Sequence, residues 1–287
     1  MRKRFKERLA DVVSPERLNT VCSSFDVIGD IAIIKTPSST LGAEDVAKQI
    51  MAIHKCVKTV LSQTSPVRGD HRVRELTLVA GENRTVTKYK ETGCIFSVDV
   101  EKCYFSPRLK HERLRIASQV SPCETVVNMF AGVGCFSVII AKKVSKTKIY
   151  SIDINPTAYQ FMKENTRLNR VYDRVHPMIG DSQDIVQTKL QGIADRVLMP
   201  LPEKALEYLP VALSALKKTG GWIHYYDFQH ATRAEDPCKK TEQKVAKKLE
   251  CIGTKYVFTC SRIIRSTGPN WYQTVLDIQV AASPSKS

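Results

Sequence analysis

The stretch Thr125-Val126-Val127-Asn128-Met129-Phe130-Ala131-Gly132-Val133-Gly134 decides the fold of this 287-residue chain. Its first six residues are typical of a buried strand, and a helix is expected from about Cys135 to Lys143. A strand, a glycine-rich turn and a helix in this order are typical of open α/β sheets, which bind ligands at the carboxyl ends of their strands. Gly132 and Gly134 let the backbone approach a ligand because they carry no Cβ. The Gly-x-Gly-x-x-Gly pattern of NAD sites is absent, since Ser137 holds the sixth position.

Strand-like runs alternate with helical patterns after this stretch. The runs are Lys148 to Ile154, Val175 to Gly180, Arg196 to Leu201 and Gly221 to Phe228. A helix is expected from Pro156 to Asn169. This alternation predicts a parallel, doubly wound sheet. The last two runs, Tyr256 to Ser266 and Trp271 to Ala281, are joined by Gly268-Pro269-Asn270, so the sheet is expected to end in an antiparallel hairpin.

The residues before the sheet predict a smaller α+β domain. The expected divisions are a basic arm or helix over residues 1–22, the α+β domain over 23–110 and the sheet domain over 111–287. Phe25 to Lys35 predicts a hairpin around Gly29-Asp30, and Glu44 to Leu61 has a helical period. Three more strand-like runs follow, namely Leu76 to Val79, Arg84 to Lys90 and Ile95 to Val100.

The composition indicates a negatively charged partner. The chain has 44 Lys and Arg against 29 Asp and Glu, a net charge of +15 and a pI of about 9.4. Such a pI is typical of nucleic-acid binding; a basic enzyme without such a partner is the plainer alternative. No run approaches the ~20 apolar residues of a membrane span. The hydrophobic content of 43% excludes a disordered chain.

The cysteine pattern predicts neither a zinc site nor a redox site. Nine cysteines are present, an odd number, and no two of them form a Cys-x-x-Cys pair. The charged segment from Met1 to Arg8 has no apolar stretch behind it, so no secretory signal is expected. We therefore expect a cytoplasmic protein with reduced thiols and no bound metal. Structural roles are expected for His71, His111 and His224, and positions in the core for Trp222 and Trp271.

Two carboxylates follow the next two predicted strands. Asp153 lies where an acidic residue can accept both ribose hydroxyls of an adenosine. Asp181 is placed to accept from an adenine amino group, although either aspartate alone is as well explained as a helix N-cap. Together with the Gly-x-Gly turn, these residues match the S-adenosylmethionine site of class I methyltransferases. The antiparallel final hairpin matches that fold as well.

Five stretches together resemble the archaeal and eukaryotic-type tRNA (guanine-37 N1) methyltransferases. They are Phe105 to Arg113 (FSPRLKHER), Asn128 to Phe136 (NMFAGVGCF), Tyr150 to Pro156, Ala194 to Pro202 (ADRVLMPLP) and His224-Tyr225-Tyr226. The similarity runs from about Phe25 to the end of the chain. The Ser-Pro-Arg-Leu-x-x-Glu-Arg element is specific because it lies outside the generic methyltransferase fold.

The resemblance implies methyl transfer from S-adenosylmethionine to N1 of guanosine 37, next to the tRNA anticodon, with an adjoining domain that helps recognise the tRNA. It implies Glu112 as general base and Arg72, beside Arg74, as a contact to the target base; Tyr104 matches the family's Tyr before the same element. The implied cofactor contacts are Asn128, Phe130, Gly132, Gly134, Asp153, Asp181 and Pro200, and the implied substrate contacts are Arg108, Arg113 and Pro202. The expected partner is the anticodon stem-loop, bound by a monomer without a protein partner.

The chemistry explains these residue types. Guanine N1 carries a proton at neutral pH, so attack on a sulfonium methyl group needs a base near N1 and a donor near O6. Glu112 suits the first task and Arg72 the second, with a phosphate contact as the alternative for Arg72. Composition alone places Glu112 in a charge run typical of a solvated helix face. Tyr104 is either a core residue or a stacking partner for a base.

Two positions depart from the family pattern. Pro200 stands where members often have Asn, so no Asn side chain contacts the target base from this position, and Asn128 replaces the more usual Asp. Many members also carry an extra N-terminal domain that contacts the outer corner of tRNA, whereas only some 22 residues precede the resemblance here. Two alternative functions stay open: a tRNA-hypermodifying aminocarboxypropyl transferase with the same cofactor, and a non-catalytic RNA-binding module.

Overall fold

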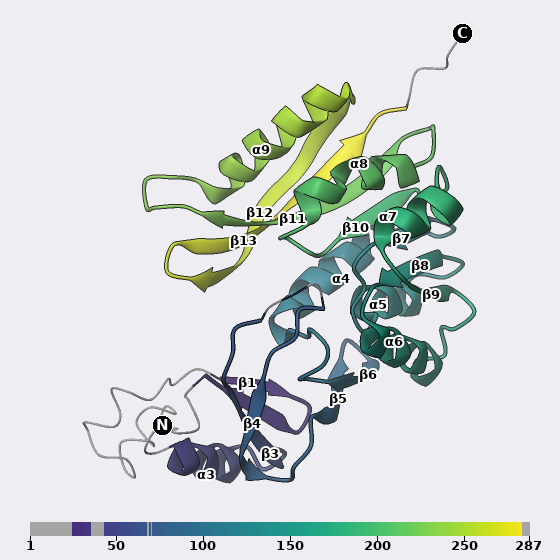
Figure 1. Cartoon of the computed structure of the whole chain (residues 1–287). Coiled ribbons are helices and arrows are strands. Elements are labelled where there is room, and N and C mark those ends of the chain that lie inside the picture. Colours follow the sequence, from purple (N-terminus) through teal and green to yellow (C-terminus); the bar gives the residue numbers. More distant parts are fainter. Residues whose placement is uncertain (1–24, 36–42, 68, 70, 283–287) are drawn as a thin grey trace. The chain divides into compact units, whose positions relative to one another are not determined.

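The chain folds as two compact units, residues 1–108 and 109–287 (Figure 1). The computed structural model describes residues 25–35, 43–67, 69 and 71–282. The arm predicted over residues 1–22 lies outside the described residues, and the sequence places the division two residues later, after residue 110. Within the described residues, no helix is long and apolar enough to cross a membrane.

The first unit contains a four-stranded sheet, in the order β1-β2-β3-β4, and a separate two-stranded hairpin, β5-β6. Its elements are β1 (Phe25–Ile28), β2 (Ile31–Ile34), α3 (Ala43–Ile53), β3 (Thr59–Gln63), β4 (Leu76–Gly81), β5 (Val86–Glu91) and β6 (Cys94–Asp99). The 3-10 turn η1 (Pro107–Leu109) crosses the division between the units. Strands β1 and β2 form the predicted hairpin, which turns at Gly29 with a φ of +59°. The strand-like runs predicted for β4, β5 and β6 are confirmed.

The helix predicted from Glu44 to Leu61 is too long. Helix α3 ends at Ile53, and β3 begins at Thr59 and pairs in parallel with β2. Val57, Val60 and Leu61 are buried, as the helical period required. Val60 and Leu61 lie in β3, which pairs with β2 and β4. β-branched residues around position 60 suit this extended backbone.

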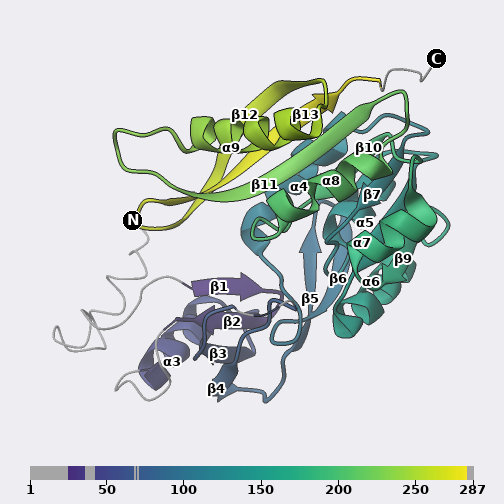
Figure 2. The same cartoon turned by 45° about the horizontal axis from the view of Figure 1, so that its top comes forward.

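The second unit is a seven-stranded sheet in the order β12-β13-β11-β10-β7-β8-β9 (Figures 1 and 2). Its strands are β7 (Thr125–Asn128), β8 (Lys148–Asp153), β9 (Val175–Ile179), β10 (Arg196–Met199), β11 (Gly221–His230), β12 (Tyr256–Gly268) and β13 (Trp271–Val280). Neighbours from β9 to β11 pair in parallel, and β13 pairs antiparallel with both β11 and β12. This confirms the doubly wound sheet with an antiparallel final hairpin.

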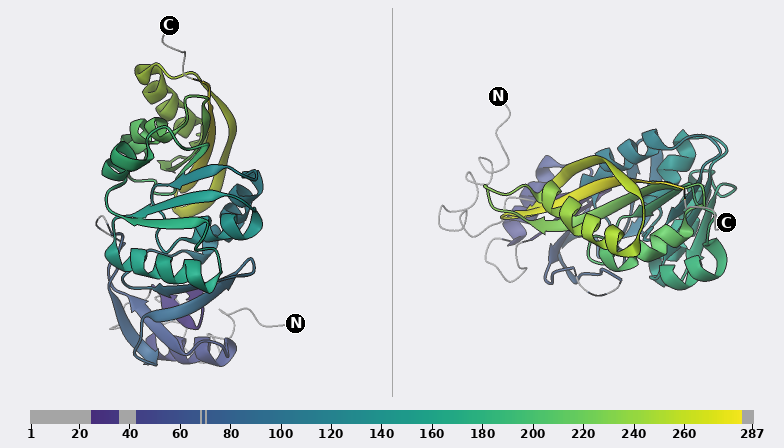
Figure 3. Two further views of the ribbon diagram at one scale, coloured as in Figure 1. Left: turned by 90° about the vertical axis from the view of Figure 1, so that its right-hand side faces the viewer. Right: turned by 90° about the horizontal axis from the view of Figure 1, so that it is seen from above.

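Helices flank the sheet of the second unit (Figure 3). They are α4 (Lys110–Gln119), α5 (Cys135–Lys143), α6 (Pro156–Leu168), α7 (Ser182–Ile185), the π-helical turn η2 (Val186–Leu190), α8 (Ala205–Ala215) and α9 (Pro237–Ile252). Helix α4 packs on α5, while α9 packs on β11, β12 and β13. Helix α6 starts where the sequence predicts, because the Asn155 side chain accepts from the N–H groups of Thr157 and Ala158 and Pro156 fills the first position.

One predicted core residue lies at the surface. Trp271 is 46% exposed, so its predicted place in the core is wrong. It begins β13 directly after the turn, where a hairpin end leaves one side of the ring uncovered. Trp222 is half-buried. The eight cysteines among the described residues are free thiols, and these residues contain no His, Cys, Asp and Glu group arranged to hold a metal ion.

Candidate active site

The glycine-rich turn lies between β7 and α5, at the carboxyl end of the parallel strands. Gly132 and Gly134 have φ angles of +57° and +89°, in the left-handed region that favours glycine. A Cβ on Gly134 would lie 2.9 Å from Cγ of Met162. The turn therefore needs glycine at both positions for its backbone, and at the second also for packing.

Asp153 ties this turn to the end of β8. Its Oδ2 accepts from the N–H of Gly132 over 2.6 Å, and its Oδ1 accepts from the N–H of Asn155 over 2.9 Å. The residue is half-buried. A carboxylate oxygen can accept more than one hydrogen bond, so these contacts are compatible with an additional hydroxyl donor.

Asp181 follows β9 and is the N-cap of α7. Its side chain accepts from the N–H of Gln183 over 2.7 Å, as the N-cap alternative predicts, and also from the Tyr208 hydroxyl over 2.7 Å. The Tyr208 ring packs edge-on against Phe130, with centroids 5.3 Å apart. These contacts bring Phe130 and Asp181, both predicted cofactor residues, into one cluster around Tyr208.

Asn128 places an unsatisfied acceptor beneath the turn. The residue is fully buried, and its Nδ2 donates to Oγ of Ser137 over 3.1 Å. Its Oδ1 has no hydrogen-bond partner among the residues that the structure describes. A buried acceptor without a donor is costly, so this atom suits a donor from a bound molecule. Pro200 and Pro202 lie between β10 and α8, the first half-buried and the second buried.

Glu112 is buried rather than on a solvated helix face, since it is only 1% exposed. Nε and Nη2 of Arg115 donate to its two oxygens over 2.9 and 2.8 Å. The Tyr226 hydroxyl donates to Oε1 over 2.8 Å. The solvated face that the charge run alone predicts is therefore wrong, and Glu112 is held in one orientation.

Arg115 also binds a second carboxylate, that of Asp277 in β13. Nη1 and Nη2 of Arg115 donate to Asp277 over 2.5 and 3.1 Å. Burial alone would raise the pKa of Asp277, but hydrogen bonds from His224 and Arg115 outweigh burial and hold that pKa below its usual range. Two carboxylates thus share one guanidinium. Arg262 lies 3.8 Å from Glu112 and is half-exposed.

His224 continues the network on the far side of Asp277. Its Nδ1 lies 2.6 Å from Oδ1 of Asp277, and its Nε2 lies 2.7 Å from Nη1 of Arg196. A guanidinium can only donate, so Nε2 accepts and Nδ1–H donates to Asp277. Burial lowers the pKa of His224, which agrees with a neutral ring. The structural role predicted for His224 is confirmed.

Arg72 and Tyr104 lie together in the first unit. The Arg72 guanidinium carbon is 3.9 Å from the Tyr104 ring centroid, a cation–π stack, and Arg72 has a φ of +51°. The neighbouring Arg74 instead donates to the backbone oxygen of Val100 and to Gln63, over 3.2 and 3.4 Å. These bonds give Arg74 a role inside the unit and favour Arg72 as the residue that meets a base.

The two arginines of the Ser-Pro-Arg-Leu-x-x-Glu-Arg element differ in exposure. Arg108 is exposed, and its Nε donates to Asp26 over 2.9 Å. Arg113 is 4% exposed and belongs to α4. A surface contact to a phosphate therefore suits Arg108 better than Arg113.

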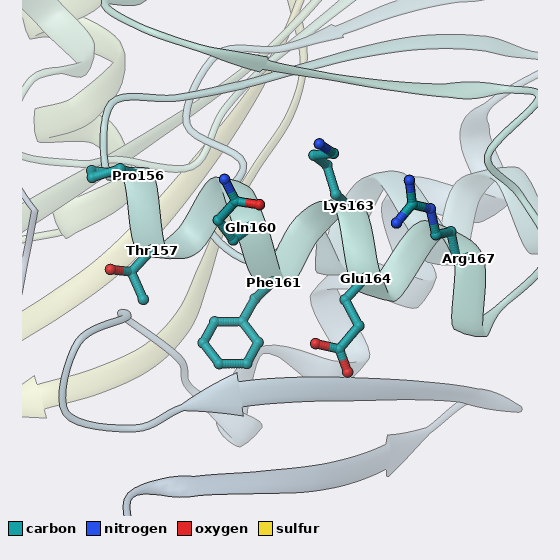
Figure 4. A pocket seen from close by; sticks show the side chains of 7 residues that line it. All are labelled: Pro156, Thr157, Gln160, Phe161, Lys163, Glu164 and Arg167. Carbon is teal, nitrogen blue, oxygen red and sulfur yellow. The ribbon is translucent and has the colours of Figure 1, made fainter.

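Helix α6 lines a pocket of about 630 Å³ (Figure 4). Its lining residues are Pro156, Thr157, Gln160, Phe161, Lys163, Glu164 and Arg167. None of these seven is a predicted cofactor residue. All seven belong to α6, which begins three residues after Asp153.

Sequence reasoning missed the partners of Glu112. Glu112 and Arg115 are three residues apart in a helix, a spacing that brings side chains together, so that pair could have been found. Asp277 lies 162 positions from Arg115, and no local pattern links the two. Tyr208 also gave no signal, because its contact with Asp181 depends on how α8 packs.

The strand order, the Gly-x-Gly turn and the two carboxylates at successive strand tips define a class I methyltransferase fold. The chain belongs to the TRM5/TYW2 methyltransferase family: the model of the TRM5/TYW2 methyltransferase domain matches residues 87–252. A second model, the TYW2 N-terminal domain, matches residues 5–85.

Three relatives show how close this likeness is. Trm5b of Pyrococcus abyssi, named a tRNA (guanine(37)-N(1))-methyltransferase, is 40% identical over 90% of this chain and 75% of its own length. Taw21 of Saccharolobus solfataricus, named a tRNA 4-demethylwyosine(37)-methyltransferase, is 36% identical over 88% and 92%. A tRNA(Phe) (4-demethylwyosine(37)-C(7)) aminocarboxypropyltransferase of Methanocaldococcus jannaschii is 33% identical over 88% and 96%.

Solved structures agree with this family. Trm5b from P. abyssi superposes with a TM-score of 0.83 and 38% identity, over 94% of this chain and 79% of that chain. The complex of aTrm5 with tRNALeu gives 0.82 and 34%, over 97% and 78%. TYW2 of M. jannaschii in complex with AdoMet gives 0.68 and 28%, over 91% and 100%.

Proposed function

We propose that this protein transfers the methyl group of S-adenosylmethionine to N1 of guanosine 37 of tRNA. The observation that carries the proposal is Glu112, a carboxylate held in a fixed orientation inside the Ser-Pro-Arg-Leu-x-x-Glu-Arg element. Two relatives named for this reaction are 40% and 39% identical to the chain over nine-tenths of its length. A carboxylate base is what attack by the ring nitrogen N1 requires.

The strand tips have the groups that the cofactor needs. Asp153 would accept from the two ribose hydroxyls, and Asp181 would accept from the adenine amino group. The Gly132 and Gly134 turn would pass close to the ligand, and the unpaired Oδ1 of Asn128 would receive a donor. Phe130 and Pro200 would supply apolar contacts. S-adenosylmethionine supplies an electrophilic methyl group on a positively charged sulfur.

The chain's own residues prepare the base for attack. Glu112 accepts the N1 proton, and the electron pair left on N1 forms the bond to the methyl carbon while the carbon–sulfur pair returns to sulfur. Arg115 and Tyr226 hold the carboxylate in one orientation, and Arg115 is itself held by Asp277. Arg72 donates to O6, where negative charge gathers, and Tyr104 holds the guanidinium of Arg72 flat.

The tRNA partner follows from charge and from the named relatives. The net charge of +15 favours phosphate contacts, which position an RNA without reading its sequence. Arg108 and the first unit would bind the anticodon stem, and Arg113 and Pro202 would shape the site of the base from within the catalytic unit. Action as a monomer in the cytoplasm stays a prediction.

A second candidate is aminocarboxypropyl transfer from the same cofactor, or methylation of an already modified base at position 37. Pro200 favours it, because the Asn that family members often use against the target base is missing here. The relatives named Taw21 and aminocarboxypropyltransferase show that the family includes such activities.

One experiment separates these functions. Unmodified tRNA transcripts and 4-demethylwyosine-containing tRNA are each incubated with cofactor labelled in the methyl group or in the carboxyl group, and the nucleosides are identified by mass. Methyl label on N1-methylguanosine supports the proposal. Carboxyl label in RNA means aminocarboxypropyl transfer, and absence of both labels on unmodified and on 4-demethylwyosine-containing tRNA means a binding module.

A further inference from the structure

The exposed end of β11 and β13 carries a pair of aromatic rings. His230 and Trp271 are register partners, and their ring centroids are 5.5 Å apart in an edge-to-face arrangement. His230 is exposed and Trp271 is 46% exposed. Trp271 is more exposed than the other tryptophan, Trp222, which is half-buried, and part of its aromatic surface faces solvent.

This pair lies on the sheet face that carries the partners of Glu112. Side chains alternate along a strand, so Trp271 and Asp277, six residues apart, share a face of β13. His230 and Tyr226 share the same face of β11. Since Asp277 contacts Arg115 and Tyr226 contacts Glu112, this is the face against which α4 packs.

Helix α9 occupies the opposite face of the same strands. Oγ1 of its Thr241 lies 2.8 Å from Oγ1 of Thr274, and Nζ of its Lys244 lies 2.9 Å from Asp227. Both partners alternate with the residues of the aromatic pair. Trp271 thus lies on the other face of the strands from α9. Figure 2 shows α9 beside the three adjacent strands β11, β12 and β13.

Two arginines lie between Glu112 and the aromatic pair. Arg262 pairs in register with Val275 and lies 3.8 Å from Glu112, while Arg265 pairs with Gln273 and donates to its Oε1 over 2.8 Å. Both arginines are half-exposed. Arg262, Arg265, His230 and Trp271 form what we call the distal strip, which contains two cations and two aromatic rings and adjoins Glu112 through Arg262.

The strip points along the substrate side of the sheet. β11 runs parallel to β10, and its carboxyl end extends beyond the edge at which the glycine turn and Asp153 lie. His230 lies four positions beyond Tyr226 in β11, which is roughly 13 Å of strand. An RNA whose base reached Glu112 would have its neighbouring nucleotides within reach of the strip.

We propose that the distal strip binds unpaired nucleotides of the substrate tRNA, with a base stacked on Trp271 and phosphates on Arg262 and Arg265. This rests on the proposed function, because the strip is argued from its distance to Glu112. Cations beside an exposed aromatic ring are an arrangement that binds single-stranded nucleic acid. An apolar protein partner would bury little apolar surface on this strip.

The test uses Trp271 as its own reporter. In a Trp222→Phe protein, Trp271 is the sole tryptophan, and titration with an anticodon stem-loop RNA should quench its emission. The converse variant Trp271→Phe, in which Trp222 is the sole tryptophan, should show a much smaller change in emission. Both variants should methylate tRNA, which establishes that they are folded.

Kinetics provide the second arm. Trp271→Ala should raise the KM for tRNA by roughly 5- to 150-fold, the range expected for one stacked base, and Trp271→Phe should recover most of the loss. The single-turnover rate at saturating tRNA and the affinity for S-adenosylmethionine should stay unchanged. Tyr172→Ala is the matched control, since Tyr172 is 67% exposed and precedes β9 at the opposite edge of the sheet.

The outcomes separate the two proposals. If the wild type methylates tRNA but Trp271→Ala has an unchanged KM and the RNA leaves Trp271 emission unaltered, the distal strip is not an RNA contact. The proposed function then stands. If the wild type neither binds nor methylates any tRNA, the proposed function fails, and this inference fails with it.

Discussion

The Tyr226 hydroxyl donates to Oε1 of Glu112 over 2.8 Å, and so joins β11 to α4 across 114 positions of sequence. Burial raises the pKa of Tyr226 well above its usual value, and the neighbouring Glu112 raises it further. The phenol therefore stays protonated and remains a donor throughout the physiological pH range. Glu112 meets its substrate from an orientation that this bond helps to fix.

Removal of the hydrogen bond from Tyr226 should disturb the position of Glu112 rather than its capacity to accept a proton. Tyr226→Phe keeps the ring but loses the donor to a buried carboxylate, which costs about 1.5–3 kcal/mol where a charged group is involved. We expect urea unfolding to show a loss of that order, and the single-turnover rate to fall while cofactor affinity stays unchanged. Tyr225→Phe, in the preceding position of β11, is the control and should leave the single-turnover rate unaltered.

Glu112→Gln tests the base itself. Glutamine keeps the size and can still accept from Tyr226, but it cannot take up the N1 proton as a carboxylate does. Methyl transfer under single-turnover conditions should drop by ~10²-fold or more, with tRNA and cofactor affinities little changed. A near-wild-type rate would leave Glu112 a structural partner of Arg115, and catalysis would then rest on Arg72 and on the Met199-to-Pro202 loop.

Asp277→Asn tests the shared guanidinium. Asp277 holds Arg115 through two hydrogen bonds, so its replacement should loosen the guanidinium that orients Glu112. We expect a slower single-turnover rate with unchanged cofactor affinity. Glu124→Gln is the matched control, because Glu124 binds Arg196 at the far end of the network. An unchanged single-turnover rate in Asp277→Asn would contradict the sharing argument.

Much of the catalytic unit could be predicted because its signals are local. The turn glycines, the start of α6 at Pro156 and the alternating strands are encoded within a few residues, and the structure has them where the sequence predicts them. Trp271 was placed wrongly because its hydrophobicity indicates burial, while its exposure depends on the end of a hairpin. The helical period through Leu61 failed for a similar reason, since pairing with β2 decides that segment.

Local sequence patterns could not predict the contacts of the candidate site. The charge run around Glu112 indicates a solvated face, and only the approach of Asp277 and Tyr226 from distant strands makes burial of that carboxylate possible. Motif resemblance pointed to Glu112 where composition did not. It could not supply Arg115 or Asp277, because neither stands in the matched element.

Asp153→Asn and Asp153→Ala should weaken cofactor binding. Each lost bond from a ribose hydroxyl to the carboxylate costs about 1.5–3 kcal/mol, or roughly 10- to 150-fold in affinity. Since Asp153 also holds the N–H of Gly132, the asparagine variant, which keeps one acceptor, should bind better than the alanine variant. Calorimetry on folded protein measures this. Asp173→Ala, an exposed aspartate before β9, is the control, and equal affinities in all four proteins would remove Asp153 from the site.

Protonation of His224 should limit stability at acid pH. Its pKa in the folded protein is lowered from 6.5, first by burial, so the unfolded chain binds the proton more readily. The contribution of His224 to the free energy of unfolding is therefore highest above about pH 6.5. It falls as the pH drops below that value, by up to ~1.4 kcal/mol per pH unit. Asp277 acts in a separate window, because its lowered pKa takes effect only below the usual carboxyl value of 3.8.

Urea unfolding at pH 7.5, 6.5 and 5.5 measures this dependence, and tryptophan emission reports the correct unit because Trp222 and Trp271 both lie in it. His224→Gln removes the titrating ring, so the variant should be less stable at pH 7.5 yet lose less stability between pH 6.5 and 5.5. His176 retains part of the slope, since burial lowers its pKa as well. The exposed His111→Gln should behave as the wild type. An identical slope in His224→Gln and wild type would mean that His224 takes up its proton equally in both states, and the neutral ring between Arg196 and Asp277 would be wrong.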